Sequence, residues 1–183
     1  MARLPKVTRE SMAPDTQQHY DSIAGSRGAV RGPFAMFLHS PDLAARIAHT
    51  GAYIRFETTL EAQYRELTIL TVARTWDCDY EWTAHQPIAE EAGTRPEAIV
   101  AIRDRTAPAG LTEREALVFT YVSTLLTTKR VPDDTFKAVL SWLGEQGVIN
   151  LTATAGYYSM LACTLNACAV MPEDEGGPSL LPA

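Results

Sequence analysis

Four side chains capable of acid–base or thiol chemistry follow one another along the chain: Glu66, Cys78, Glu81 and His85. The last three are spaced three and four residues apart, so on a helix they share one face. The same face also carries apolar residues, among them Trp82. A thiol, an acid and an imidazole on an apolar face indicate either a core with a few satisfied polar groups or the lining of a pocket.

Taken singly, these residue types favour a structural role. A lone cysteine on an apolar stripe is usually a small hydrophobic side chain, and a lone histidine is usually a hydrogen-bonded core residue. Two carboxylates in the same region change the balance, because burying a charge without a partner costs several kcal/mol. The combination therefore predicts side chains that interact with one another.

The composition narrows the class of protein. The 183 residues are 46% hydrophobic and 21% charged, enough to bury the core of one domain. A net charge of -6 without any run of Lys or Arg gives no footprint for nucleic acid or an anionic membrane. No segment has the apolar length of a signal peptide or a membrane span, so we expect a cytoplasmic protein.

The sequence carries no cofactor or metal signature. Its three cysteines, Cys78, Cys163 and Cys168, are widely spaced and form no CxxC or Cys/His zinc pattern. There is no GxGxxG and no Walker pattern either. We therefore expect neither a cofactor nor a metal, and a small molecule as the partner.

The hydrophobic period is helical throughout, and no stretch alternates long enough to require a strand. The expected fold class is all-α, a single bundle of about six to eight helices. The helices are expected at about 16–25, 41–58, 61–76, 78–92, 94–105, 112–128, 132–146 and 148–169.

Local signals set several of these boundaries. Ser40 before Pro41 predicts a helix start, and capping boxes are expected at Thr94 and Thr112. Pro87 should kink its helix, and Gly147 should separate the last two helices. The chain divides into an arm with a short helix (1–29), a main domain (30–170) and a tail (171–183), which is expected to be poorly ordered unless a neighbouring subunit holds it.

A geometric expectation follows from the short connection at Asp77. An antiparallel pairing of the two flanking helices brings Glu66, about 15 Å before the turn, level with His85, about 12 Å after it. We therefore expect the Glu66 carboxylate within hydrogen-bond reach of His85 or Glu81. The site should lie in a cavity walled by Trp82 and closed by the loop 25–34 or a neighbouring subunit.

The run Glu-x11-Cys-x2-Glu-x3-His, with the segment GYYSMLACTLNA at 156–167, resembles the carboxymuconolactone decarboxylase family. That superfamily includes the AhpD-like alkylhydroperoxidases, whose pattern is Glu-x11-Cys-x2-Cys-x3-His. Here Glu81 stands in the place of the second cysteine. The resemblance implies an AhpD-like domain over 30–170, a small-molecule substrate and a homo-oligomer of two to six subunits.

Three functions compete. In the first, a non-redox enzyme acts on a small carboxylated or lactone substrate: His85 shuttles a proton, Glu66 and Glu81 orient and balance it, and Cys78 lines the pocket. In the second, an AhpD-like thiol peroxidase uses Cys78 at a lowered pKa. Because Glu81 cannot resolve a sulfenic acid, that chemistry needs an external thiol. In the third, the chain is a catalytically silent oligomeric binding module.

The remaining pocket candidates come from the resemblance and from loops. Tyr157, Tyr158 and Asn166 match the family's last helix in position, and Phe34 and Arg31 belong to the loop expected to close the site. Arg31 is the candidate for binding a substrate carboxylate. The helix 148–169 is apolar on nearly every side, which predicts that other chains cover it.

Overall fold

The computed structural model describes residues 2–182, in which every regular element is helical, as expected for an all-α fold. Short 3-10 turns lie at Arg9–Ser11 (η1) and Pro172–Glu175 (η3), and a π-helical turn, η2, covers Tyr53–Glu57. The α-helices are α1 (Gln17–Arg27), α2 (Pro33–Phe37), α3 (Pro41–Ala52), α4 (Ala62–Thr75), α5 (Asp79–Glu91), α6 (Pro96–Arg103), α7 (Glu113–Thr128) and α8 (Asp133–Cys168).

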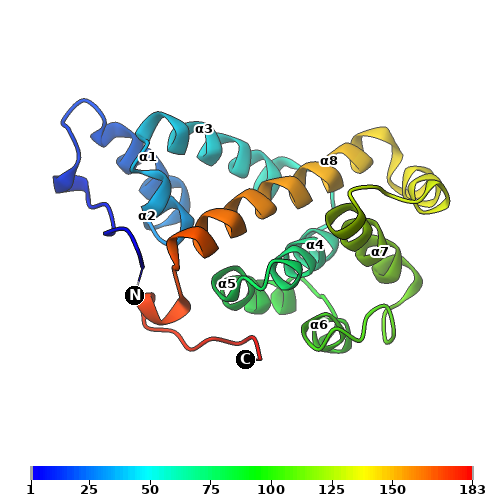
Figure 1. The fold of residues 1–183 in the computed structure, drawn as a ribbon. Helices are drawn as coiled ribbons and strands as arrows, with labels where there is room; N and C mark the ends of the chain where they lie inside the picture. Colours follow the sequence, from blue (N-terminus) through cyan, green and yellow to red (C-terminus); the bar gives the residue numbers. More distant parts are fainter. Residues whose placement is uncertain (1, 183) are drawn as a thin grey trace.

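Helix α4 is the centre of the bundle. It packs against α5, α6, α7 and α8, and its residues from Glu66 to Ala73 are all buried. Its turns from Leu67 to Ala73 carry only apolar and threonine side chains, so they have to be covered all round, which explains the position of the helix. Figure 1 shows α8 running across the molecule, with α1 to α3 on one side and α4 to α7 on the other.

Helices begin where the sequence predicts unless the capping side chain forms a tertiary hydrogen bond instead. Ser40 and Pro41 open α3 as expected. At α7 the Thr112 hydroxyl accepts from the Glu115 N–H, while the Glu115 carboxylate accepts from the Thr112 N–H at 2.7 Å. The capping box expected at Thr94 is wrong: α6 begins one residue later, because the Thr94 hydroxyl donates to the Gln63 carbonyl of α4 instead.

Two boundaries differ from the sequence prediction. The break expected at Gly147 lies at Gly144, whose φ of 67° leaves the helix, while Gly147 is buried within it against Leu143. Helix α2 occupies part of the segment predicted as a loop, since Pro33 provides its first turn. Among the helices of residues 2–182, none is both long and apolar enough to cross a membrane.

The C-terminal segment lies along α5 of its own chain. The backbone N–H of Leu180 donates to the Thr83 hydroxyl at 3.1 Å, and the Ser179 hydroxyl donates to Asp79. The expectation that a neighbouring subunit would be needed to hold this tail is therefore wrong. Polar side chains on the outer face of α5 hold it instead.

Apolar side chains remain exposed where η2 meets α8, and they generate a prediction about assembly. Ile149 is 66% exposed and Phe56 64%, and the Tyr53 hydroxyl bonded to Asn150 joins the two elements. We predict a homo-oligomer that covers this patch, and Ile149→Glu should lower its mass toward the 20.0 kDa monomer. Light scattering at micromolar concentration measures this, with Val100→Glu, an exposed position on α6, as the control. A wild-type monomer would contradict the prediction.

Candidate active site

A tight turn places α4 against α5. Asp77 adopts a left-handed conformation, with φ at 45°, and forms ion pairs with Arg74 and Arg105. The N–H of Cys78 donates to the Ala73 carbonyl at 2.8 Å, which closes the turn. The chain reverses within three residues, so the buried faces of the two helices meet.

The expected contact between Glu66 and His85 is present. Glu66 Oε2 lies 2.7 Å from His85 Nδ1, and Arg65 Nε lies 3.3 Å from the other oxygen of the same carboxylate. On the opposite side of the ring, His85 Nε2 is 3.5 Å from Glu81 Oε2. Glu66, Glu81 and His85 are each no more than 6% exposed, so the imidazole is held between two carboxylates in a nearly dry setting.

The pKa values of the two carboxyl groups are shifted in opposite directions. Burial alone would raise the pKa of Glu66. The hydrogen bond and charge of His85, together with the charges of Arg65 and Arg55, outweigh burial, so the pKa of Glu66 is lowered. Burial raises the pKa of Glu81, and the opposing charges of His85 and Arg55 do not offset it. Glu66 is therefore the ionised partner of His85, while Glu81 is the carboxyl that retains a proton more readily.

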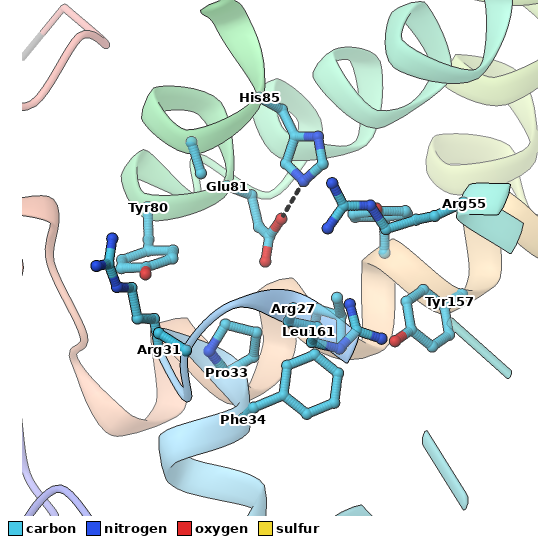
Figure 2. Close-up of a pocket in the computed structure, with 13 residues that line it drawn as sticks. Arg27, Arg31, Pro33, Phe34, Arg55, Tyr80, Glu81, His85, Tyr157 and Leu161 are labelled. Carbon is cyan, nitrogen blue, oxygen red and sulfur yellow. Dashed lines mark ion pairs between the residues drawn. The ribbon is translucent and has the colours of Figure 1, made fainter. Parts of the chain in front are cut away.

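A cavity of about 160 Å³ opens beside this cluster. Glu81 and His85 line it (Figure 2), whereas Glu66 is not part of its wall. The remaining wall is aromatic and basic: Arg27, Ala29, Arg31, Pro33, Phe34, Arg55, Tyr80, Ala84, Tyr157, Tyr158 and Leu161. No group of three or more His, Cys, Asp or Glu side chains in the described chain is arranged to hold a metal ion.

The structure brings some of the expected pocket residues together and places others elsewhere. Arg31, Phe34 and Tyr157 line the cavity. Trp82 does not: it is fully buried and its indole N–H donates to Gln86. One step of 100° along α5 turns it from the face shared by Glu81 and His85 into the core. Asn166 is exposed and donates to the Trp76 carbonyl, outside the cavity.

Cys78 differs most from its expected environment. It is 0% exposed and is absent from the cavity wall. Burial, with the charges of Glu81 and Asp79, raises the pKa of its thiol to about 12, although backbone N–H groups at the start of α5 oppose the shift. The expectations of a pocket-lining thiol and a lowered pKa are therefore wrong for this structure, because desolvation outweighs the helix start.

Tyr158, expected with Tyr157 on the last helix, lines the wall, whereas Tyr80, Arg27 and Arg55 were not identified from the sequence. Tyr158 packs edge-on against His85, with ring centroids 5.1 Å apart, and Tyr80 stands at the outer rim. Arg27 ends α1 and Arg55 lies in the π-helical turn. Neither arginine has a sequence signal, because both belong to elements that precede α4 in the chain and reach the site only through tertiary packing.

Comparison with known proteins connects this arrangement to a family. Residues 41–123 match the model of the carboxymuconolactone decarboxylase family. That segment contains Glu66, Cys78, Glu81 and His85. Among curated proteins, none matches the chain by sequence.

Solved structures share the fold at low identity. An alkylhydroperoxidase AhpD core, the uncharacterized peroxidase-related protein from Ralstonia eutropha JMP134, has a TM-score of 0.78 at 16% identity, covering 95% of this chain and 93% of that one. A peroxidase-related protein from Silicibacter sp. TM1040 gives 0.74 at 15%, covering 93% and 91%. The debrominase Bmp8, in complex with 2,3,4-tribromopyrrole, gives 0.72 at 13%, covering 92% of each chain. At these identities the likeness establishes an AhpD-like fold.

Opposite shifts at the two glutamates predict opposite effects of neutralising them. Glu81→Gln should raise the free energy of unfolding at pH 7, because the raised pKa costs folded stability as pH rises above the unfolded value of about 4.3. The gain should shrink toward zero by about pH 4. Chemical denaturation from pH 4 to 8 measures it, and a gain that does not depend on pH would contradict the assignment.

Glu66→Gln provides the matched comparison. It should lower the free energy of unfolding at pH 7 by about 1.5–3 kcal/mol, because it weakens a charged hydrogen bond to His85. Since the folded pKa of Glu66 is lowered, this contribution is present above about pH 4.3 and is lost as pH falls through the folded pKa. Equal effects of the two substitutions would mean that the carboxylates are not distinct.

A glycine at the cavity rim yields a prediction about packing. Gly32 has φ at 52°, and a Cβ there would overlap the Tyr80 ring. Gly32→Ala should cost about 2–5 kcal/mol, from backbone strain plus overpacking. Gly28→Ala, also at positive φ but in open space, should cost about 1–2 kcal/mol. Thermal denaturation compares them, and the Tyr80→Ala background should remove most of the difference.

Proposed function

We propose, from the premise that this chain belongs to the carboxymuconolactone decarboxylase and AhpD-like superfamily, that it is a non-redox enzyme catalysing proton transfer on a small molecule. The superfamily contains enzymes. One observation carries the proposal: an imidazole held between two buried carboxylates of opposite proton affinity, with two of the three groups facing a cavity. Such a pair suits general acid–base catalysis near neutral pH.

Each residue has a distinct role in this proposal. Glu66 accepts a hydrogen bond from His85 Nδ1–H, which leaves Nε2 as the nitrogen nearest Glu81. Glu81 and His85 then exchange a proton with the substrate, and Glu66 stabilises the imidazolium when it forms. Glu66 is a positioning residue, since it does not line the cavity.

The reaction class follows from a proton relay without a redox partner. His85 removes a proton from a carbon next to a carbonyl, and Glu81 returns one at another position of the same molecule, which isomerises it. In a decarboxylation, the carbon–carbon bond electrons stay on the substrate as carbon dioxide leaves, and the same pair protonates the carbanion. A small carboxylated or lactone substrate fits either course.

The environment of Cys78 supports the choice of acid–base over thiol chemistry. At a pKa of about 12, roughly one thiol in 10⁵ is ionised at pH 7. The thiolate is the nucleophile in peroxide reduction, and this thiol lies outside the cavity wall. A peroxidase would require the region around Cys78 to open first.

A pair of variants tests the proposal. His85→Gln should lower the rate of carbon-bound hydrogen exchange into small lactones and carboxylates in D₂O by about 10²–10⁴-fold, because the proton acceptor is lost. Cys78→Ala should retain the rate within about tenfold. Proton NMR follows the exchange, and circular dichroism checks that each variant is folded.

The thiol peroxidase is tested on the same proteins with hydrogen peroxide and dithiothreitol. Peroxide consumption that disappears in Cys78→Ala and persists in His85→Gln would reverse the assignment. If the wild type catalyses neither reaction and His85→Gln unfolds, the binding-module alternative gains support instead.

A further inference from the structure

The wall of the cavity facing the acid–base pair carries three arginines. Arg27, Arg31 and Arg55 come from α1, the following loop and η2, and all three reach the same cavity. Among the side chains that the structure describes, none of them forms an ion pair. Figure 2 shows Arg55 turned toward His85, Arg27 beside Tyr157, and Arg31 beside Tyr80.

Arg27 is held in place but only partly satisfied. Its Nη2 donates to the Ala48 carbonyl at 3.2 Å, and its guanidinium lies 4.1 Å from the centroid of the Phe34 ring. Its Nε–H is buried and has no hydrogen-bond partner among the described atoms. An unpaired donor on a buried charge is costly, and at a cavity wall it indicates a ligand that accepts the bond.

Arg55 occupies the position between Arg27 and the acid–base pair. It is half-buried, and its side chain donates no hydrogen bond to any residue in 2–182. Its charge contributes a downward shift to the pKa of Arg27, of Glu66 and of Glu81, although burial keeps the pKa of Glu81 raised overall. Arg55 is therefore electrostatically coupled to each of them. Two neighbouring guanidinium groups repel each other unless an anion lies between them.

The size and shape of the site narrow the choice of anion. The cavity volume of about 160 Å³ is similar to that of a protein cavity of about 150 Å³ that binds benzene. A ligand with a single ring or a short chain therefore fits. A planar guanidinium binds a carboxylate through two parallel hydrogen bonds, and the aromatic wall favours a planar ligand body.

We propose that Arg27 and Arg55 form the subsite for a carboxylate of the substrate, which places its reacting carbon at the opposite wall, beside Glu81 and His85. This inference rests on the proposed function and specifies its substrate: a small carboxylate anion of about one ring in size. Arg31, which is exposed at the rim, draws the anion inward.

Binding of a simple probe tests the subsite without any turnover. Sodium benzoate should bind the full-length protein in isothermal titration calorimetry, and benzamide, its neutral isostere, should bind at least about tenfold more weakly. Arg27→Gln and Arg55→Gln should each weaken benzoate binding at least about tenfold. Arg130→Gln, which removes one charge at an exposed position outside the cavity, should leave it unchanged.

Further variants guard against misfolding. Arg27→Lys and Arg55→Lys keep the charge but lose the planar fork, so they should recover part of the affinity lost in the glutamine variants. Circular dichroism without benzoate checks that each variant is folded.

The outcomes separate this inference from the proposed function. Equal binding of benzoate and benzamide, or unchanged binding in Arg55→Gln, would overturn the subsite even if His85 proves catalytic. Tighter binding of inorganic phosphate than of benzoate would also overturn it, since the site would then suit a tetrahedral anion. Conversely, His85→Gln should still bind benzoate, so the subsite stands on its own if the proton-transfer chemistry fails.

Discussion

The hydrogen bond between Glu66 and His85 is the interaction on which the site depends. It joins α4 to α5 inside the core, where an unpaired carboxylate would cost several kcal/mol. The bond fixes which ring nitrogen faces Glu81, and it separates the two carboxylates into an ionised one and a readily protonated one. The tight turn at Asp77 is its structural counterpart, because a longer connection would let the two helices slide past each other.

Burial has different consequences for the three reactive groups of this cluster. His85 and Glu81 are nearly inaccessible to solvent yet touch the cavity, and burial raises the pKa of Glu81. Cys78, a few residues earlier, is buried away from the cavity, and the same desolvation holds its thiol protonated. Our proposal of acid–base rather than thiol chemistry rests on this difference in position, although the fold is shared with peroxidase-related proteins.

The basic wall completes this picture. Three arginines that form no ion pair among the described side chains face Glu81 and His85, and in our proposal a substrate carboxylate balances their charge. In such a design the ligand supplies a charge that the protein leaves out. The unsatisfied Nε–H of Arg27 is the local sign of it.

The sequence by itself predicted the features that depend on helical periodicity and on short separations along the chain. The helical period gave the all-α class, the spacing of Glu81 and His85 placed them on one face, and the short connection at Asp77 implied their meeting with Glu66, as found. Each of these depends on residues fewer than about twenty positions apart. Only the tertiary structure decided that Trp82 and Asn166 lie outside the cavity and that Cys78 is sealed from it. It also decided that Arg27 and Arg55 enter, because the cavity wall is assembled from elements distant in the chain. Burial depends on what covers a residue, and helical periodicity does not contain that information.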